Sequence, residues 1–579
     1  YDAPAATRTR RRNGARHVPG RLTSKIFSLN HIIAPLTDVR RRALPRPRIF
    51  ARVKPLILTA TALLAAVSCL PAHAQAPPSP ATSTSHAGAA FVRDSLDAYI
   101  RRGMKAWNIP GLAIAIVKDG QVVVSKGYGV REVGKPEPVD NKTLFYIASN
   151  SKLFTGTAVS ALVEEKKLSL DDRVTKHIPD FQLWDSTSTR LCTVRDLLCH
   201  RLGTKTFQGD FTFWNSSLPR MEIVRRMRLL KPEFQFRQEY GYCNSAFTAA
   251  GEIIGRVSGE SWEDYITTEF LRPLGMTNTA ALTAGIEVRP NLARPYTTGL
   301  GKLERLPYDK IDALAPAASI VSCVDDMSKW LRFQLDSGRT ADGRRLLPWS
   351  VLQRTRDGNT LVSTRRHPRR PMHFQAYGLG VYTGDYNGRQ IYWHTGGADG
   401  FVSGTCFVPE AGLGLVILTN QDNQAFFEAL RYQLLDAYLG VPYIDRSRQA
   451  LVPTRAAETQ DARDRAGLLD RAAKGRESNA KLPRDFRNYL GSYQHPLMGV
   501  IKVEADGASK RDLRIVFPSL PGLTAKMEWM SGEEWLLTYS NPAYGRFPAT
   551  FTGEGEKVGT LTIKVNDFLE YDPYTFTKR

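Results

Sequence analysis

The sequence predicts an α+β fold in two parts: an antiparallel sheet flanked by helices with a helical insert, and a small antiparallel β domain after it. Within residues 91–440, strand-like segments stand at both ends and helical segments between them. One sheet must therefore take its strands from distant parts of the sequence. From Leu482 onward, short aromatic-rich strands alternate with Gly, Pro and Asn turns, which is typical of a small barrel or sandwich.

The N-terminal region indicates export. Residues 1–52 are rich in Arg and Pro, and we interpret them as a mis-called extension, because a start at Val53 would give the next segment a compact form. Residues 53–74 combine a short basic region, an apolar run and the small-x-small site Ala72-His-Ala74. We predict a signal peptide cleaved after Ala74 and a periplasmic or secreted protein. A lipoprotein anchored at Cys69 is the weaker alternative.

Composition excludes several function classes. Of the formal charge of +22, +12 lies in residues 1–54, and the remaining +10 is spread over more than 500 residues without a long basic run. Nucleic-acid binding is therefore not expected. The apolar run of the signal is too short to span a bilayer, so no membrane span is expected. The sequence contains no metal-ligand or nucleotide-binding motif, so no cofactor is predicted, and it does not indicate an oligomeric state.

The cysteines predict neither a disulfide framework nor a zinc site. Five remain after the signal peptide, an odd and scattered number that favours small buried thiols. Only the first two are close in sequence. The five are Cys192, Cys199, Cys243, Cys323 and Cys406.

The first elements follow from periodicity. Residues 75–90 contain mostly Pro, Ala, Ser and Thr, which predicts a linker. Residues 91–107 have apolar positions at helical spacing, which predicts an amphipathic helix. Two apolar runs, 111–117 and 122–124, flank Asp119-Gly120 and predict a β-hairpin.

The remaining elements complete the two parts. Residues 193–275 are mainly helical in pattern, and 376–419 contain further strands, followed by a helix over 424–439 that stops at Gly440. Residues 441–482 are charged and polar, which predicts a linker with one exposed helix. Residues 483–579 form the predicted β domain.

A candidate nucleophile lies where an apolar strand end runs into an apolar helix. Ser149 and Lys152 are three residues apart and would share one face of that helix. A desolvated lysine can accept the proton of a serine hydroxyl, and the first N–H groups of the helix can bind an oxyanion. The alternative is that Ser149 only caps the helix. A second S-x-x-K, Ser478 to Lys481, has no strand before it, and we attribute that copy to chance.

Two more segments carry candidate site residues. Tyr242-Cys-Asn244 precedes a helix, where the phenol can shuttle protons and the amide can hold a substrate carbonyl. His394-Thr395-Gly396-Gly397 ends a strand whose glycines allow close approach of a substrate backbone. Core packing is the structural alternative for both. Tyr539-Ser-Asn541 repeats the second pattern but follows the third one.

Taken in order, Ser149/Lys152, Tyr242/Asn244 and His394/Thr395/Gly396 resemble the penicillin-binding and class C β-lactamase-like serine hydrolases. The residues that flank these motifs also resemble those of the family over most of residues 100–435. Tyr489-Leu-Gly-Ser-Tyr493 resembles the start of the lipocalin-like domain that follows some of these hydrolases.

The resemblance implies a β-lactamase/transpeptidase-like sheet and an acyl-enzyme on Ser149 that water hydrolyses. It implies that Lys152 and Tyr242 share the proton transfers, without deciding which is the base, and that Asn244 orients the substrate. The N–H groups of Ser149 and Gly397 would form the oxyanion hole.

The third motif differs from that of class C β-lactamases, which have Lys-Thr-Gly. With His394, Thr395 and Gly396 binding the substrate, the resemblance favours peptides that contain D-residues over β-lactams. An ester hydrolase is the close alternative, and a binding protein without turnover is the alternative from another class. An ordinary imidazole pKa of about 6.5 would let His394 change its charge in the acid range.

Overall fold

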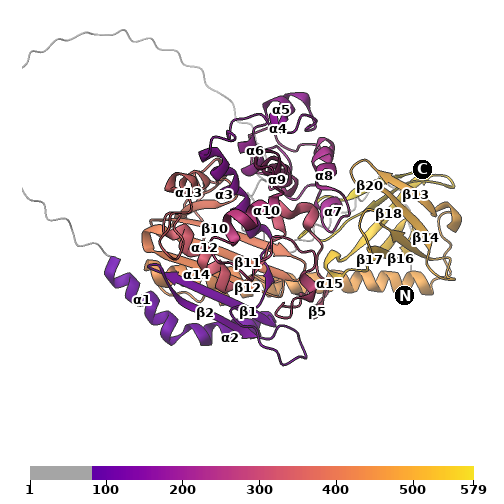
Figure 1. The fold of residues 1–579 in the computed structure, drawn as a ribbon. Coiled ribbons are helices and arrows are strands. Elements are labelled where there is room, and N and C mark those ends of the chain that lie inside the picture. The colour runs from indigo at the N-terminus through magenta and orange to yellow at the C-terminus, as the bar shows by residue number, and fades with distance from the viewer. Residues whose placement is uncertain (1–80) are drawn as a thin grey trace, which may run out of the picture.

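A computed structural model describes residues 81–579, with side chains from residue 87 onward, as two packed parts (Figure 1). The predicted extension, the signal peptide and Cys69 lie outside these residues. The α+β fold with a C-terminal β domain is confirmed.

The larger part is organised around one antiparallel sheet. The N-terminal hairpin pairs with the last strand of the domain, so the sheet joins distant parts of the sequence as predicted. In spatial order the strands are β2 (Gln121–Gly129), β1 (Gly111–Lys118), β12 (Leu413–Thr419), β11 (Phe401–Val408), β10 (Arg389–Ala398), β9 (Tyr382–Tyr386), β8 (Gln375–Tyr377) and β7 (Thr360–Ser363).

Helices cover both faces of this sheet, and glycines let them approach closely. A Cβ added at Gly404 of β11 would lie 3.3 Å from the Phe427 ring of α14 (Phe426–Leu439). One at Gly414 of β12 would lie 3.2 Å from Leu331 of α12 (Val324–Leu335). Because Gly414 pairs with Phe407, three residues from Gly404, the two helices lie on opposite faces.

The first helix corrects the prediction for residues 75–90. Residues 81–90 are helical rather than linker, within α1 (Ala81–Asp94), which a break at Ser95 separates from α2 (Leu96–Trp107). A Cβ at Gly88 would lie 2.3 Å from the Tyr438 ring of α14. The small residues that resemble a linker in sequence thus allow α1 to pack closely on α14.

The helical insert and its flanking segments pack beside the sheet. Helix α3 (Ser151–Glu164) packs on α9 (Asn244–Ser258), α11 (Ala315–Ala318) and α13 (Trp349–Arg356). The other short helices are α4 (Val174–His177), α5 (Ser186–Leu191), α6 (Val194–Leu198), α7 (Asp210–Phe213), α8 (Arg220–Arg226) and α10 (Trp262–Ile266). Two small ribbons pair β3 (Phe145–Tyr146) with β6 (Val321–Ser322) and β4 (Tyr296–Thr297) with β5 (Glu304–Arg305).

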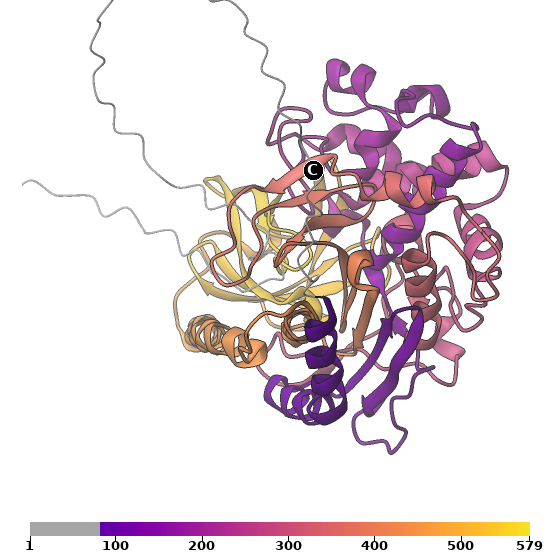
Figure 2. The ribbon, with the colours of Figure 1, turned by 90° about the vertical axis from the view of Figure 1, so that its left-hand side faces the viewer.

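One long helix, α15 (Arg446–Glu477), occupies most of the predicted polar linker. It runs beside the C-terminal domain in Figure 1 and is seen nearly end-on in Figure 2. Its start is fixed by the buried ion pair of Arg446 with Asp436, 2.6 Å long. At its other end, a Cβ at Gly475 would lie 2.3 Å from the Trp529 carbonyl oxygen. The helix therefore contacts both parts, one at each of its ends.

The C-terminal domain is a closed antiparallel barrel. Buried and exposed positions alternate along most of its strands, as expected when one face fills the barrel interior. The strands are β13 (Gly491–His495), β14 (Gly499–Ala505), β15 (Asp512–Val516), β16 (Thr524–Ser531), β17 (Glu534–Tyr539), β18 (Arg546–Glu554), β19 (Lys557–Ile563) and β20 (Tyr574–Lys578).

Helix α7 of the insert docks into this barrel. The Phe211 side chain is fully buried among barrel aromatics and meets the Tyr574 ring edge-on, with centroids 5.2 Å apart. The rings of Phe517, Tyr539 and Tyr544 lie about it as well. The larger part thus supplies a residue of the barrel's aromatic core.

Two further predictions concern the residues described. All five cysteines are free and buried, so Cys192 and Cys199 form no bond. Between residues 81 and 579, no helix is long and apolar enough to cross a membrane.

Replacing Phe211 by Ala should destabilise the docking of the barrel by about 3–5 kcal/mol, because it leaves an aromatic-lined cavity. Urea unfolding followed by tryptophan fluorescence should show a lower midpoint. The control is Phe374→Ala, at a side chain that is 39% exposed, which should stay within about 0.5 kcal/mol of the parent. Equal midpoints for the two variants would contradict the docking role.

Candidate active site

The predicted nucleophile lies on a strained turn. Ser149 belongs to a short 3₁₀ turn, Ala148–Asn150, that leads directly into α3. Ala148 has φ +46°, a left-handed conformation that costs a non-glycine residue on the order of 1 kcal/mol. The Ser403 hydroxyl donates to the Ile147 carbonyl (2.7 Å) and accepts from the Asn150 amide (2.8 Å). These bonds tie the turn to strand β11.

Strand β10 packs against the same turn through Gly396. A Cβ at this position would lie 2.1 Å from the Ile147 carbonyl oxygen and 2.5 Å from the Ser403 hydroxyl. No other residue type fits without moving the backbone. The glycine of the third motif therefore sets the distance between the nucleophile turn and the sheet.

Lys152 is completely buried behind Ser149. Its Nζ lies 3.1 Å from Ser149 Oγ, 2.7 Å from Asn244 Oδ1 and 2.9 Å from the Ala317 carbonyl oxygen. Burial lowers the pKa of this amine well below its usual value, and Asp210 opposes that shift only in part.

In the neutral form that burial favours, this amine has two N–H groups and one lone pair. The Asn244 and Ala317 oxygens only accept hydrogen bonds, so they take the two N–H groups of a neutral amine. The remaining lone pair then faces the Ser149 hydroxyl, which can donate to it. This is the arrangement that a base needs in order to activate a serine.

Asn244 is held in place from its other side. Its Nδ2 donates to Asp210 Oδ2 at 2.7 Å, which fixes which end of the amide points at Lys152. Asp210 is fully buried at the start of α7, and burial and then nearby Glu570 raise its carboxyl pKa well above the usual range. Sequence reasoning missed Asp210, because no motif surrounds it.

Tyr242 completes the group. Its hydroxyl hydrogen-bonds Ser149, and its ring lies 4.6 Å from Lys152 Nζ. Burial raises the pKa of this phenol well above 10, so it stays protonated. The buried His200, also missed, stacks on it with ring centroids 4.1 Å apart, and its Nδ1 accepts the Cys243 N–H at 3.0 Å.

His394 differs from the sequence expectation. It is 1% exposed, and burial and then Lys152 lower its pKa to about 3, far from the ordinary 6.5. Nδ1 lies 2.6 Å from the Thr395 carbonyl, which can only accept, so Nδ1 carries the hydrogen. Nε2 then accepts from the Tyr377 hydroxyl at 2.8 Å. The imidazole is therefore a neutral tautomer whose two nitrogens are bonded within the protein.

The remaining predicted residues divide between two positions. Thr395 and Gly397 are partly exposed, and both line a cavity of about 550 Å³ that also contains Ser149, Tyr242 and Asn244. Gly396 is buried and does not line that cavity. The structure thus brings the three motifs together around one cavity.

Known proteins are similar to the chain over the part that carries the three motifs. A family model described as beta-lactamase matches residues 96–439, more than half of the chain. The chain belongs to the β-lactamase family. Its members include the serine hydrolases whose motif order the sequence resembles, and the described part of the chain has their fold.

Three individual proteins illustrate the similarity. Protein flp of Staphylococcus aureus (strain COL) is 28% identical over 336 residues, which cover 57% of this chain and 64% of that protein. The unguisins hydrolase ungD' of Aspergillus campestris is 29% identical over 358 residues, 59% of this chain and 64% of its own. The match therefore spans less than two thirds of these relatives' length.

A solved structure, the octameric penicillin-binding protein homologue from Pyrococcus abyssi, shares the fold. The TM-score is 0.53 at 21% sequence identity, and the match covers 83% of this chain and 99% of that one.

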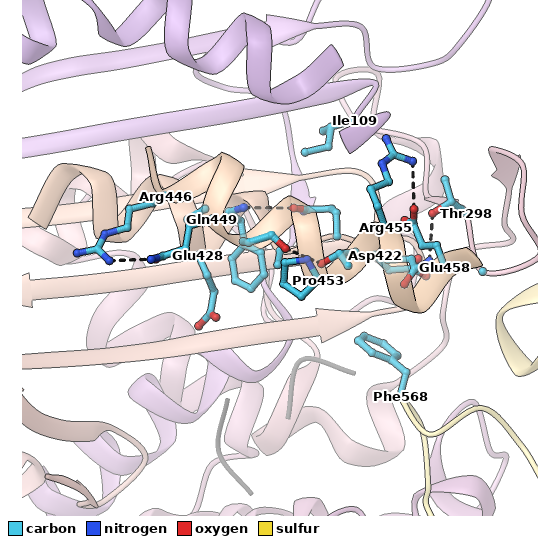
Figure 3. Close-up of a pocket in the computed structure, with 18 of the residues that line it drawn as sticks. Ile109, Thr298, Asp422, Glu428, Arg446, Gln449, Pro453, Arg455, Glu458 and Phe568 are labelled. Atoms are coloured by element: carbon cyan, nitrogen blue, oxygen red, sulfur yellow. Dashed lines mark hydrogen bonds and ion pairs between the residues drawn. The ribbon is translucent and has the colours of Figure 1, made fainter. Parts of the chain in front are cut away.

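A second, larger cavity of about 2040 Å³ adjoins the first (Figure 3). Glu239, Gln375 and Phe568 line both cavities. Between β7 and β8, the loop residues Arg365, Arg366, Arg369 and Arg370 also line the larger one. Within the described residues these four arginines form no ion pair with an acid. The larger cavity is thus basic along this loop, while carboxylates such as Glu239 and Glu428 line it elsewhere.

His394→Gln should change how stability depends on pH. Below pH 6.5 the unfolded chain binds a proton at His394 that the folded chain does not bind until about pH 3, so this residue destabilises the fold as the pH falls. Between pH 7 and pH 5 the parent should lose about 2 kcal/mol more than the variant. Urea unfolding at both pH values measures this difference, and parallel losses would show an imidazole that titrates normally.

Proposed function

We propose that this protein is an exported serine hydrolase that forms an acyl-enzyme on Ser149 and cleaves peptides containing D-residues. The observation that carries the hydrolase assignment is the buried amine of Lys152, whose Nζ lies 3.1 Å from Ser149 Oγ. A binding protein would not need a desolvated base at this position, because burying an amine costs free energy.

The proposed reaction begins with proton transfer from the Ser149 hydroxyl to the Lys152 amine. The serine oxygen attacks the substrate carbonyl, and the N–H groups of Ser149 and Gly397 receive the developing oxyanion. Tyr242, whose raised pKa keeps it protonated, delivers a proton to the leaving nitrogen. Water then hydrolyses the acyl-enzyme with the same groups acting in reverse.

The basic cavity favours peptides with a free carboxylate. Arginine side chains bind carboxylates with two parallel hydrogen bonds, and the four loop arginines, which form no ion pair in the described part of the chain, line the space next to the nucleophile cavity. Since His394 is neutral, this loop replaces it as the source of positive charge. The His-Thr-Gly motif supports action on peptides rather than β-lactams, and the name of the unguisins hydrolase supports a hydrolase. A hydrolase of uncharged esters is the competing candidate, because it would use the same nucleophile without needing the arginines.

Export is part of the proposal. Its support is the sequence of residues 53–74, which lies outside the described structure. Mass spectrometry of the exported protein should find an N-terminus near Gln75, whereas a retained, lipid-modified Cys69 would favour the lipoprotein alternative.

A fluorophosphonate probe should label the protein at Ser149. Ser149→Ala should abolish labelling, and Lys152→Ala should slow it by about 100-fold or more, because the base is lost. Lys167→Ala is the matched control, since this exposed lysine just beyond the same helix pairs only with Glu165. Labelling of another serine would overturn the site.

The substrate class is tested with the same preparation. D-Ala-D-Ala peptides, their C-terminal amides, p-nitrophenyl esters and a chromogenic cephalosporin should be compared by kcat/KM. The free peptide should exceed its amide by about 10-fold or more, and Arg370→Gln should reduce that ratio. Equal rates for peptide and amide, together with faster ester cleavage, would favour the esterase.

A further inference from the structure

One loop of the barrel domain reaches the catalytic cavity. The segment between β19 and β20 contributes Phe568, Leu569 and Tyr571 to the lining of the cavity that holds Ser149. The loop is fixed at its base, because the Asn566 N–H donates to the Tyr544 carbonyl and its side-chain amide to the Ala543 carbonyl. We refer to residues 566–572 as the barrel loop.

Phe568 lies directly on the predicted oxyanion hole. A Cβ at Gly397 would be 2.6 Å from Phe568 Cζ, so the tip of the ring touches this glycine. The same side chain lines the basic cavity, where Figure 3 shows it opposite Pro453 of α15. The ring therefore lines both the cavity that contains Ser149 and the larger cavity that contains the four arginines.

Glu570 acts two residues further along. Its carboxylate accepts the N–H groups of Gly209 (2.8 Å) and Phe211 (2.9 Å), on either side of Asp210. The Tyr574 hydroxyl also donates to it, at 2.9 Å. Two backbone bonds to one carboxylate fix both the position and the direction of this short segment.

Hydrogen bonds link this segment to Lys152, the proposed base. Asp210, held between the two bonds, accepts from Asn244 at 2.7 Å, and Asn244 accepts from Lys152 at 2.7 Å. All three side chains are at least 96% buried. Two other interdomain bonds also reach the cavity lining: Lys205 Nζ donates to Asp572 Oδ1 at 3.0 Å, and the Asn541 amide donates to Asp399 Oδ2 at 3.0 Å.

We propose that the barrel loop is a working part of the active site, in which Phe568 limits the size of the substrate group beside Gly397 and Glu570 positions Lys152 through Asp210 and Asn244. This proposal rests on the acyl-enzyme function proposed above. It gives the C-terminal domain a role in specificity and in base geometry.

The Phe568 part is tested with Phe568→Ala and two series of p-nitrophenyl-type esters. One series varies the acyl group with a fixed leaving group, and the other varies the leaving group with a fixed acyl group. The variant should gain about 10-fold or more for the bulkiest members of one series relative to the smallest. Phe547→Ala, at a barrel aromatic that lines neither cavity, is the control and should keep the parent profile. A uniform change in both series, or no change, would overturn the size-limiting role.

The Glu570 part is tested with Glu570→Gln, which keeps the shape but loses one acceptor and the charge. The titratable groups around Lys152 are Asp210, His200, Tyr242, Cys243 and His394. Burial raises the pKa of Glu570 to about 7, so its charge acts on Asp210 near and above that pH. Without this charge Asp210 ionises more readily there and raises the Lys152 pKa, so the acid limb of fluorophosphonate labelling should extend to higher pH. Labelling at pH 7 should slow by about 10-fold.

Two controls separate positioning from a merely structural effect. Glu534→Gln removes a barrel carboxylate that pairs with Arg471 on the surface and should leave the limb unchanged. In the Asp210→Asn variant, adding Glu570→Gln should no longer move the acid limb of labelling to higher pH. A limb that stays fixed in Glu570→Gln, or moves equally with and without Asp210, overturns the relay. If the parent protein itself is not labelled at Ser149, the hydrolase function fails instead.

Discussion

The active site depends on excluding water from one amine, that of Lys152. An ammonium group in the position of Lys152 would lose most of its hydration, so the protein holds the neutral form, and each unit of pKa shift corresponds to about 1.4 kcal/mol. The neutral amine still needs partners for its two N–H groups. They come from Asn244 at the start of α9 and Ala317 in α11, more than 70 residues apart. The architecture of the insert follows from bringing these two acceptors to one point.

The sheet meets the nucleophile turn under a similar constraint. The left-handed Ala148 is unfavourable on its own and persists because neighbouring groups fix the turn. Ser403 bonds both the Ile147 carbonyl and the Asn150 side chain, while Gly396 leaves room for that carbonyl. A larger residue in place of Gly396 would push the turn off the sheet and away from the base. The motif glycine therefore serves packing more than substrate contact.

Local chemistry explains what the sequence could predict. The hairpin, the helix of Ser149 and Lys152, and the strands of the third motif follow from short-range periodicity, and motif order identified which S-x-x-K to choose. The helix over residues 81–90 was not predicted, because the sequence does not reveal that its small residues pack against Tyr438 of α14. Asp210 and Glu570 were missed because their significance lies in contacts across more than 300 residues. The His394 pKa depends on burial, which a motif does not reveal.

The barrel has to be understood together with the hydrolase part. A lipocalin-like domain suggests a separate carrier of small molecules, but Phe211 of the hydrolase part packs among Phe517, Tyr539, Tyr544 and Tyr574 of the barrel. The barrel returns the contact through Glu570, whose carboxylate pKa burial raises to about 7. In such an acid the folded state binds its proton more tightly than the unfolded chain, so its contribution to stability is complete below about pH 4.5 and is lost as the pH rises through 7. Protonation of Glu570 is therefore coupled to folding, and burial raises the pKa of the neighbouring Asp210 carboxyl as well. Since an ionised Asp210 would favour the charged form of Lys152, the same burial that holds the domains together helps to keep the base neutral.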